Sequence, residues 1–165
     1  MRRHVLFAVM VVIALLVGAC GSKPSSNDGA TTRLDSVSVS GQPDAKPTIT
    51  ISDQAPPGSL QVQDLIEGSG AEAVAGKQVT VQYVGVAWST RKQFDASWDR
   101  GQPFSFPLGV GQVIPGWDQG VAGMKAGGRR LLVIPPELGY GAGGFPPVIE
   151  PNETLVFVID LVAVG

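Results

Sequence analysis

The sequence predicts an α+β fold, in which an antiparallel sheet of five or so strands wraps around one short α-helix. Several short segments alternate apolar and polar residues as half-buried strands do, whereas only the segment that starts at Pro115 has the periodicity of a helix. The 165 residues also include 22 glycines and 13 prolines, well above the roughly 12% expected from average usage. This composition favours turns and short strands over long helices.

The expected strands follow one another from residue 47 to the end of the chain. Residues 78–87 give the clearest alternation, because Val79, Val81 and Tyr83 fall on one face. Residues 154–164 are apolar almost throughout, which fits a central position in the sheet. A loop over residues 137–151 carries apolar residues, which is unusual unless the loop is functional. The expected strands are residues 47–52, 60–67, 78–87, 94–95, 104–106, 129–134 and 154–164.

The expected helix begins at Pro115, whose missing N–H costs nothing at the first helical position. Trp117, Val121 and Met124 are spaced to share one face of this helix, which is about three turns long at most. Trp117 has two interpretations: it is a core anchor under the sheet, or it is the floor of an apolar pocket. The pocket is favoured because backbone N–H groups just before a helix are still free to bind a ligand.

The first twenty residues predict export and lipidation. Residues 1–4 are basic, and residues 5–17 form an apolar run that is too short to span a bilayer comfortably but suits a signal peptide. Residues 17–20 (Val-Gly-Ala-Cys) resemble the lipobox of bacterial lipoproteins, in which the cysteine is lipidated and becomes N-terminal. We therefore expect a signal peptide over residues 1–19 and a lipid anchor at Cys20, which would place the protein on the extracytoplasmic side of the cell membrane. The alternative is a free thiol after an ordinary signal peptide.

The remaining chain divides into a tether and one domain. Residues 20–47 are rich in Ser, Thr, Asn, Asp, Gly and Pro, so we expect the lipidated cysteine to be followed by a flexible tether. Residues 48–165 are the expected folded domain. Removal of residues 1–19 takes away two of the 12 basic residues and none of the 14 acidic ones, so the formal charge falls from −2 to −4.

Composition excludes several classes of function. The only histidine, His4, leaves with the signal peptide, and Cys20 is the only cysteine. A Ser-His-Asp triad and a His- or Cys-rich metal site are therefore excluded from the mature chain. Charged residues make up only 16% of the sequence and form no basic cluster, so a nucleic acid is not an expected partner.

An ordered set of motifs resembles the FKBP-type peptidyl-prolyl cis-trans isomerases from about Leu60 to Gly165. The resemblance implies a half-open antiparallel sheet curled round a short helix, in agreement with the fold expected from the patterns. Phe145 departs from the histidine common in animal members, and residues 89–92 lack their frequent Asp-Gly turn. The motifs are Val-Gln-Tyr-Val-Gly at 81–85, Phe-Asp-Ala-Ser at 94–97, Pro-Phe-Ser-Phe-Pro-Leu-Gly at 103–109, Val-Ile-Pro-Gly-Trp at 113–117, Gly-Tyr-Gly at 139–141 and Thr-Leu-Val-Phe at 154–157.

The resemblance also implies a site. The Ile114 N–H would hold a substrate carbonyl, and Arg100 would pair with Asp95. For Asp95, a purely structural role through Arg100 and a contact with substrate both stay open, and Phe104 and Phe157 could be plain core. The catalytic residues implied are Tyr83, Phe94, Asp95, Trp117, Tyr140 and Phe157, and the substrate-binding residues are Phe104, Val113, Ile114, Val148 and Ile149.

The implied function is isomerisation of X–Pro bonds in exported proteins, outside the cytoplasmic membrane. Proline-containing polypeptides would be the substrates, and macrolides of the FK506 or rapamycin kind would be inhibitors. A dry aromatic pocket needs no cofactor, since it can favour the twisted amide by differential binding. The alternative is a chaperone or surface module that binds proline-containing segments without catalysis.

Overall fold

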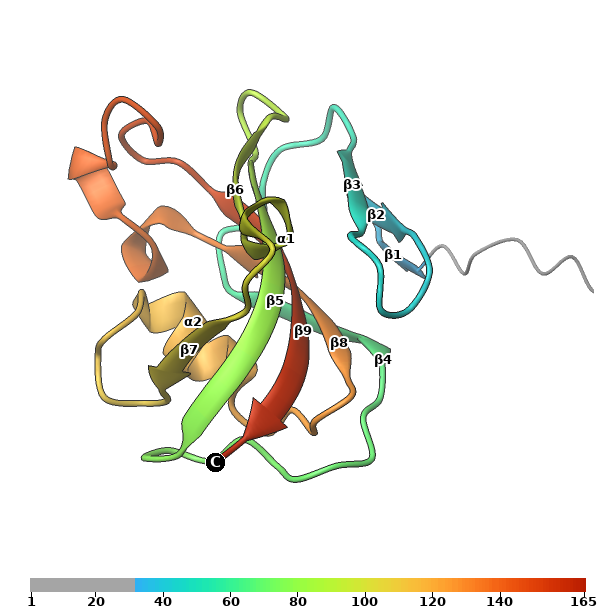
Figure 1. Cartoon of the computed structure of the whole chain (residues 1–165). Helices are drawn as coiled ribbons and strands as arrows, with labels where there is room; N and C mark the ends of the chain where they lie inside the picture. The colour runs from blue at the N-terminus through green and yellow to red at the C-terminus, as the bar shows by residue number, and fades with distance from the viewer. Residues whose placement is uncertain (1–31) are drawn as a thin grey trace, which may run out of the picture.

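The computed structural model describes residues 32–165 (Figure 1). Within this range, no helix is long and apolar enough to cross a membrane. The strands are β1 (Thr32–Leu34), β2 (Val37–Ser40), β3 (Thr48–Ile51), β4 (Gln61–Ile66), β5 (Gln78–Ala87), β6 (Gln93–Ala96), β7 (Phe104–Pro107), β8 (Arg129–Ile134) and β9 (Leu155–Val164). The helices are α1 (Ser97–Arg100) and α2 (Pro115–Val121), with 3-10 turns η1 (Pro136–Leu138) and η2 (Gly141–Gly143).

Six strands form one antiparallel sheet in the order β4-β8-β9-β5-β6, and β7 also pairs with β5. The long strand β5 holds β7 along its first half and β6 along its second half, while β9 runs along its other edge. The sheet lies against α2 in Figure 1. The predicted α+β fold is therefore confirmed, and so is the central position of the last strand.

The six-stranded sheet is buried on both faces. One face packs against α2, where Trp117 and Val121 join Val81 and Ile159 in the main core. The other face carries Val84, Val86, Leu131, Val133, Val156 and Val158, and these side chains are also buried. A second sheet, β1-β2-β3, covers this outer face on the side away from α2 (Figure 1).

The predicted flexible tether is wrong for its second half, because residues 32–47 are part of the fold. Val37 and Val39 of β2 are 1% and 3% exposed and pack with Ile51 against the outer face of the large sheet. Burial of each such side chain contributes about 1.5–3 kcal/mol, which offsets the cost of ordering this polar segment. The predictions for the signal peptide, for Cys20 and for the start of the tether lie outside the described residues.

The helices differ in detail from the prediction. Helix α2 begins at Pro115 as expected, but it ends at Val121, so it is shorter than the spacing to Met124 indicated. Ala122 leaves the helical conformation and Gly123 takes a positive φ of 78°, which turns the chain. Met124 is nevertheless buried in the main core. The four-residue helix α1 was not predicted.

Candidate active site

A cavity of about 430 Å³ opens between the large sheet, α2 and the loop that follows η1. Its lining holds no charged side chain, and most of its members are aromatic or aliphatic. Apolar walls of this kind leave few polar groups to orient a ligand. The lining residues are Tyr83 from β5, Phe104 from β7, Gln112, Val113 and Ile114 from the loop before α2, Trp117 from α2, Tyr140 from the later loop and Phe157 from β9.

Trp117 lies at the centre of the aromatic side chains. Its ring centroid is 5.0 Å from that of Tyr83 and 5.2 Å from that of Phe157, and both pairs are edge-to-face. The side chain is only 5% exposed, yet it still contributes to the cavity lining. Its indole N–H has no hydrogen-bond partner among residues 32–165. Trp117 is therefore both a core residue and the floor of the cavity, so the two interpretations are not exclusive.

Tyr83, Asp95 and Arg100 form a hydrogen-bonded group at one wall, which we call the wall network. The Arg100 guanidinium donates to the Tyr83 hydroxyl at 2.7 Å, and the hydroxyl in turn donates to the Asp95 carboxylate. Arg100 also pairs with Asp95, as predicted. Burial and the bond to Asp95 raise the pKa of the Tyr83 hydroxyl to about 12.

The wall network uses both carboxylate oxygens of Asp95, since Oδ1 accepts from Arg100 and Oδ2 accepts from Tyr83. Asp95 itself is not part of the cavity lining. The geometry supports the structural interpretation of Asp95, which holds the Tyr83 ring in place. A contact between Asp95 and substrate stays a prediction.

The rim of the cavity is held by the first turn of α2. Asp118 accepts hydrogen bonds from the backbone N–H groups of Gly109 and Gly111, at 2.8 and 2.9 Å. One carboxylate therefore ties the loop to the helix that supplies the floor. Within the described chain, the Ile114 N–H donates no hydrogen bond, while the Ile114 carbonyl accepts from the Trp117 N–H at 2.9 Å. This donor is free for the role predicted for Ile114, and that role stays a prediction.

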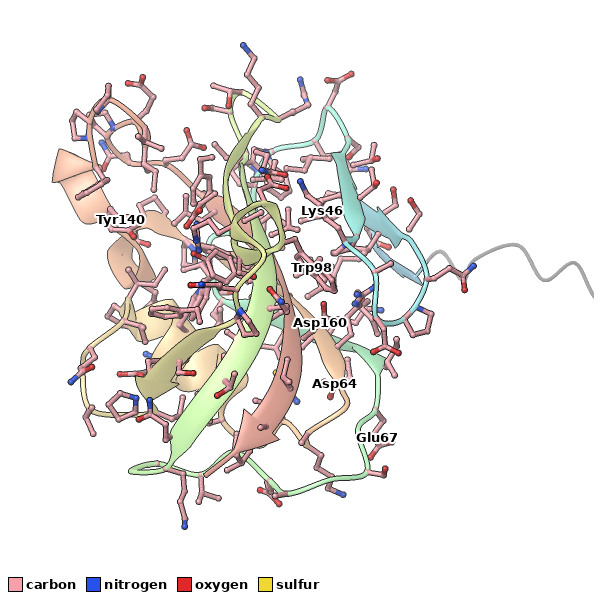
Figure 2. The ribbon with its side chains drawn as sticks, in the orientation of Figure 1. Lys46, Asp64, Glu67, Trp98, Tyr140 and Asp160 are labelled. Atoms are coloured by element: carbon pink, nitrogen blue, oxygen red, sulfur yellow. The ribbon has the colours of Figure 1, made fainter. Side chains whose placement is uncertain are left out.

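The later loop supplies one side of the cavity through Tyr140, whose ring packs against Phe145 with centroids 5.6 Å apart. Tyr140 is labelled in Figure 2 on this loop. Burial, together with the negative charge of Asp95, raises the pKa of its hydroxyl. The hydroxyl is therefore protonated at neutral pH and available as a hydrogen-bond donor.

Several predicted site residues lie outside the cavity lining. Phe94 packs edge-on against Phe157, with centroids 5.5 Å apart, and with Val148 it lines a separate hollow of about 320 Å³. Ile149 is only 3% exposed and belongs to the main core. Gln112 lines the cavity but was not predicted; its position directly before Val113 was the signal available.

Gly85 explains how the aromatic wall fits against β5. A side-chain carbon at this position would lie 2.7 Å from the rings of both Phe94 and Phe157. Only glycine lets these two rings approach the strand so closely.

Among the described residues, there is no cluster of His, Cys, Asp and Glu that could hold a metal ion.

A sheet wrapped round a short helix, with an uncharged aromatic cavity over that helix, is the arrangement expected of a prolyl isomerase. The model of the family "FKBP-type peptidyl-prolyl cis-trans isomerase" matches residues 70–162, and the chain belongs to this family. The activity of the protein is therefore peptidyl-prolyl cis-trans isomerisation.

Known relatives agree with this assignment. An FK506-binding protein of Streptomyces anulatus is 57% identical over 122 residues, which cover 72% of this chain and 97% of the relative. An FK506-binding protein of Neisseria meningitidis serogroup A is 55% identical over 107 residues, which cover 65% of this chain and 97% of the relative. The solved crystal structure of AtFKBP13 is 40% identical, with a TM-score of 0.61, and the match covers 67% of this chain and 96% of that one.

Proposed function

We propose that the protein is a lipid-anchored prolyl isomerase that acts on exported proteins outside the cytoplasmic membrane, through the cavity over Trp117. The cavity is the observation that carries the proposal for the site. The basic start, the apolar run and Cys20 at the beginning of the sequence support the location. The activity comes from the family, whereas the proposed location rests only on the first twenty residues.

The reaction needs a binding site rather than an acid or a nucleophile. Rotation about an X–Pro bond faces a barrier of roughly 18–20 kcal/mol, which amide resonance creates. The twisted transition state has lost this resonance and much of the charge separation of the planar amide. A cavity that excludes water disfavours the polar planar form relative to the twisted form, so the cavity lowers the barrier by differential binding.

The described residues divide this work. The proline ring would rest on Trp117, between Tyr83 and Phe157. The free Ile114 N–H would hold a carbonyl of the substrate, and the Tyr140 hydroxyl would donate a second hydrogen bond. The wall network fixes the orientation of the Tyr83 ring, because the Tyr83 hydroxyl is hydrogen-bonded to both Asp95 and Arg100.

An isomerase assay tests the site. The chain from residue 20, carrying Cys20→Ser, should accelerate isomerisation of short X-Pro-Phe peptides in a protease-coupled assay. We also propose that a macrolide such as FK506 occupies the same cavity, since relatives are named for binding it. FK506 should therefore inhibit competitively. Binding of a proline peptide with no acceleration at micromolar protein would instead select a non-catalytic binding module.

The membrane anchor has a separate test in cells. Labelling with an alkyne fatty acid should mark the full-length protein, and Cys20→Ala should abolish the label and release the protein from the membrane fraction. A matched Ser22→Ala variant, two residues further on, should keep both the label and the membrane association. Soluble full-length protein with an unmodified Cys20 would refute the anchor.

A further inference from the structure

The short helix α1 touches the wall of the cavity with its first and last residues. The Ser97 hydroxyl oxygen accepts a hydrogen bond from the Tyr83 backbone N–H at 2.8 Å. The Arg100 guanidinium donates to the Tyr83 hydroxyl at 2.7 Å and pairs with Asp95. Both the backbone and the ring of Tyr83 are therefore held from α1.

The two middle residues of α1 face the N-terminal sheet. Trp98 is half-buried and packs against the apolar cluster that contains Val37 and Ile51. The Asp99 carboxylate pairs with the Lys46 ammonium at 2.5 Å, and this bond lowers the pKa of Asp99. Figure 2 shows Lys46 and Trp98 between α1 and the sheet β1-β2-β3. Helix α1 thus connects the N-terminal sheet to the wall network.

The loop that carries Lys46 is itself fixed to the large sheet. The Arg129 side chain is only 4% exposed, and its guanidinium donates to the carbonyl oxygens of Gln42 at 3.1 Å and Ala45 at 2.8 Å. Asp160 supplies the balancing charge beside Arg129. The loop that carries Lys46 is therefore held in place by Arg129, which fixes the position of Lys46 beside α1.

We propose that the N-terminal sheet is a positioning element of the isomerase, which holds α1 through Trp98 and Lys46 and thereby fixes the wall network. The sheet precedes the region that the family model matches, residues 70–162. The inference rests on the proposed function in one respect, because it takes the cavity over Trp117 as the isomerase site.

Lys46→Met tests the polar half of this link, since it removes the charge and keeps most of the apolar stem. We expect kcat/KM on an uncharged, capped X-Pro-Phe peptide to fall by about 2–5-fold, the range that exposed ion pairs support. Lys46→Arg should restore it. The matched control is Asp53→Asn, which breaks the exposed pair with Arg91 beside the same sheet without touching α1. This control should keep wild-type kcat/KM.

Trp98→Ala and Trp98→Phe test the apolar half. Trp98→Ala should lower kcat/KM by about tenfold, since it removes the packing of this side chain against the cluster that contains Val37 and Ile51. Trp98→Phe should stay close to wild type, because the Trp98 indole N–H has no hydrogen-bond partner in residues 32–165. Assays run well below the melting temperature of each variant separate this effect from unfolding.

The deciding readout is independent of activity. Backbone NMR shifts of Tyr83, Asp95 and Arg100 should move in Lys46→Met and Trp98→Ala, while the shift of Val62 in β4 should not. Unmoved wall shifts in both variants, or an equal loss of kcat/KM in Asp53→Asn, would overturn the proposal. Should Trp98→Ala fail to fold, Lys46→Met and its Arg rescue decide. An inactive wild-type protein would defeat the proposed site, yet the wall shifts would still test the positioning.

Discussion

Trp117→Ala is the most informative change, because Trp117 serves both stability and the site. The ring is 5% exposed and has aromatic neighbours at centroid distances of 5.0 Å (Tyr83), 5.2 Å (Phe157) and 5.5 Å (Phe106). Truncation of such a packed ring costs roughly 3–5 kcal/mol of unfolding free energy. Each edge-to-face pair accounts for about 0.5–1.5 kcal/mol of that beyond simple burial.

Activity should fall with the same substitution. Loss of the floor enlarges the cavity, admits water and removes the surface on which the proline ring rests, so we expect kcat/KM to drop on the order of tenfold or more. Trp117→Leu keeps part of the apolar floor and should retain measurable turnover. Trp117→Phe should perform better still, since no hydrogen bond of the indole N–H is lost within residues 32–165.

Two measurements on each variant decide the matter. Urea denaturation gives the unfolding free energy, and the protease-coupled assay at low temperature gives kcat/KM for the folded fraction. A folded Trp117→Ala protein with wild-type kcat/KM would refute the role of the floor. A stable Trp117→Phe protein as inactive as Trp117→Ala would mean that the indole N–H binds the substrate directly.

Other residues give further predictions. Asp95→Asn should cause a modest loss of turnover rather than the roughly 10²–10⁴-fold loss of a general acid or base, and the rate should be flat from about pH 6 to 8 because residues 32–165 contain no histidine; a bell-shaped pH profile would contradict this. Asp118→Asn should speed hydrogen exchange at the Gly109 and Gly111 amides and raise KM a few-fold, as bonds to a charged acceptor contribute about 1.5–3 kcal/mol; unchanged exchange would count against it. The unfolding free energy should fall by up to ~3 kcal/mol as the pH rises from 10 to about 12, because the unfolded chain loses the Tyr83 proton at 10.0 while the folded chain keeps it. Tyr83→Phe should make that fall smaller. Calorimetry of both proteins from pH 10 to about 12 measures the unfolding free energy, and an equal fall in the two would contradict the prediction.

The strands of the family domain were predictable because their patterns are local. Strands β5 and β8 begin and end at the predicted residues, and β9 starts one residue later than predicted. In the N-terminal sheet, β3 lies within the predicted strand 47–52, but β1 and β2 were missed, because β2 reads Val-Ser-Val-Ser inside a polar segment. Two valines are too few to indicate a strand until the apolar face that they cover is known.

The site was predictable where it depends on chain order and not where it depends on side-chain direction. Val113, Ile114 and Trp117 lie in one short motif around the start of α2, and all three line the cavity. Ile149 sits in a loop, where no periodicity tells which way a side chain points, and it turns into the core. Gln112 also lies in a loop without periodicity. The path of that loop places Gln112 at the cavity, and its residue type gave no sign of this.

The double burial of the large sheet has a practical consequence for anyone who produces this protein. A recombinant fragment that begins after β3, at residue 52, would lack the cover over Val84, Leu131, Val156 and Val158 and would present these side chains to water as one apolar patch. Patches of this kind drive self-association. Such a fragment should precipitate or form oligomers at concentrations where a protein that retains residues 32–51 remains monomeric, and light scattering would show the difference.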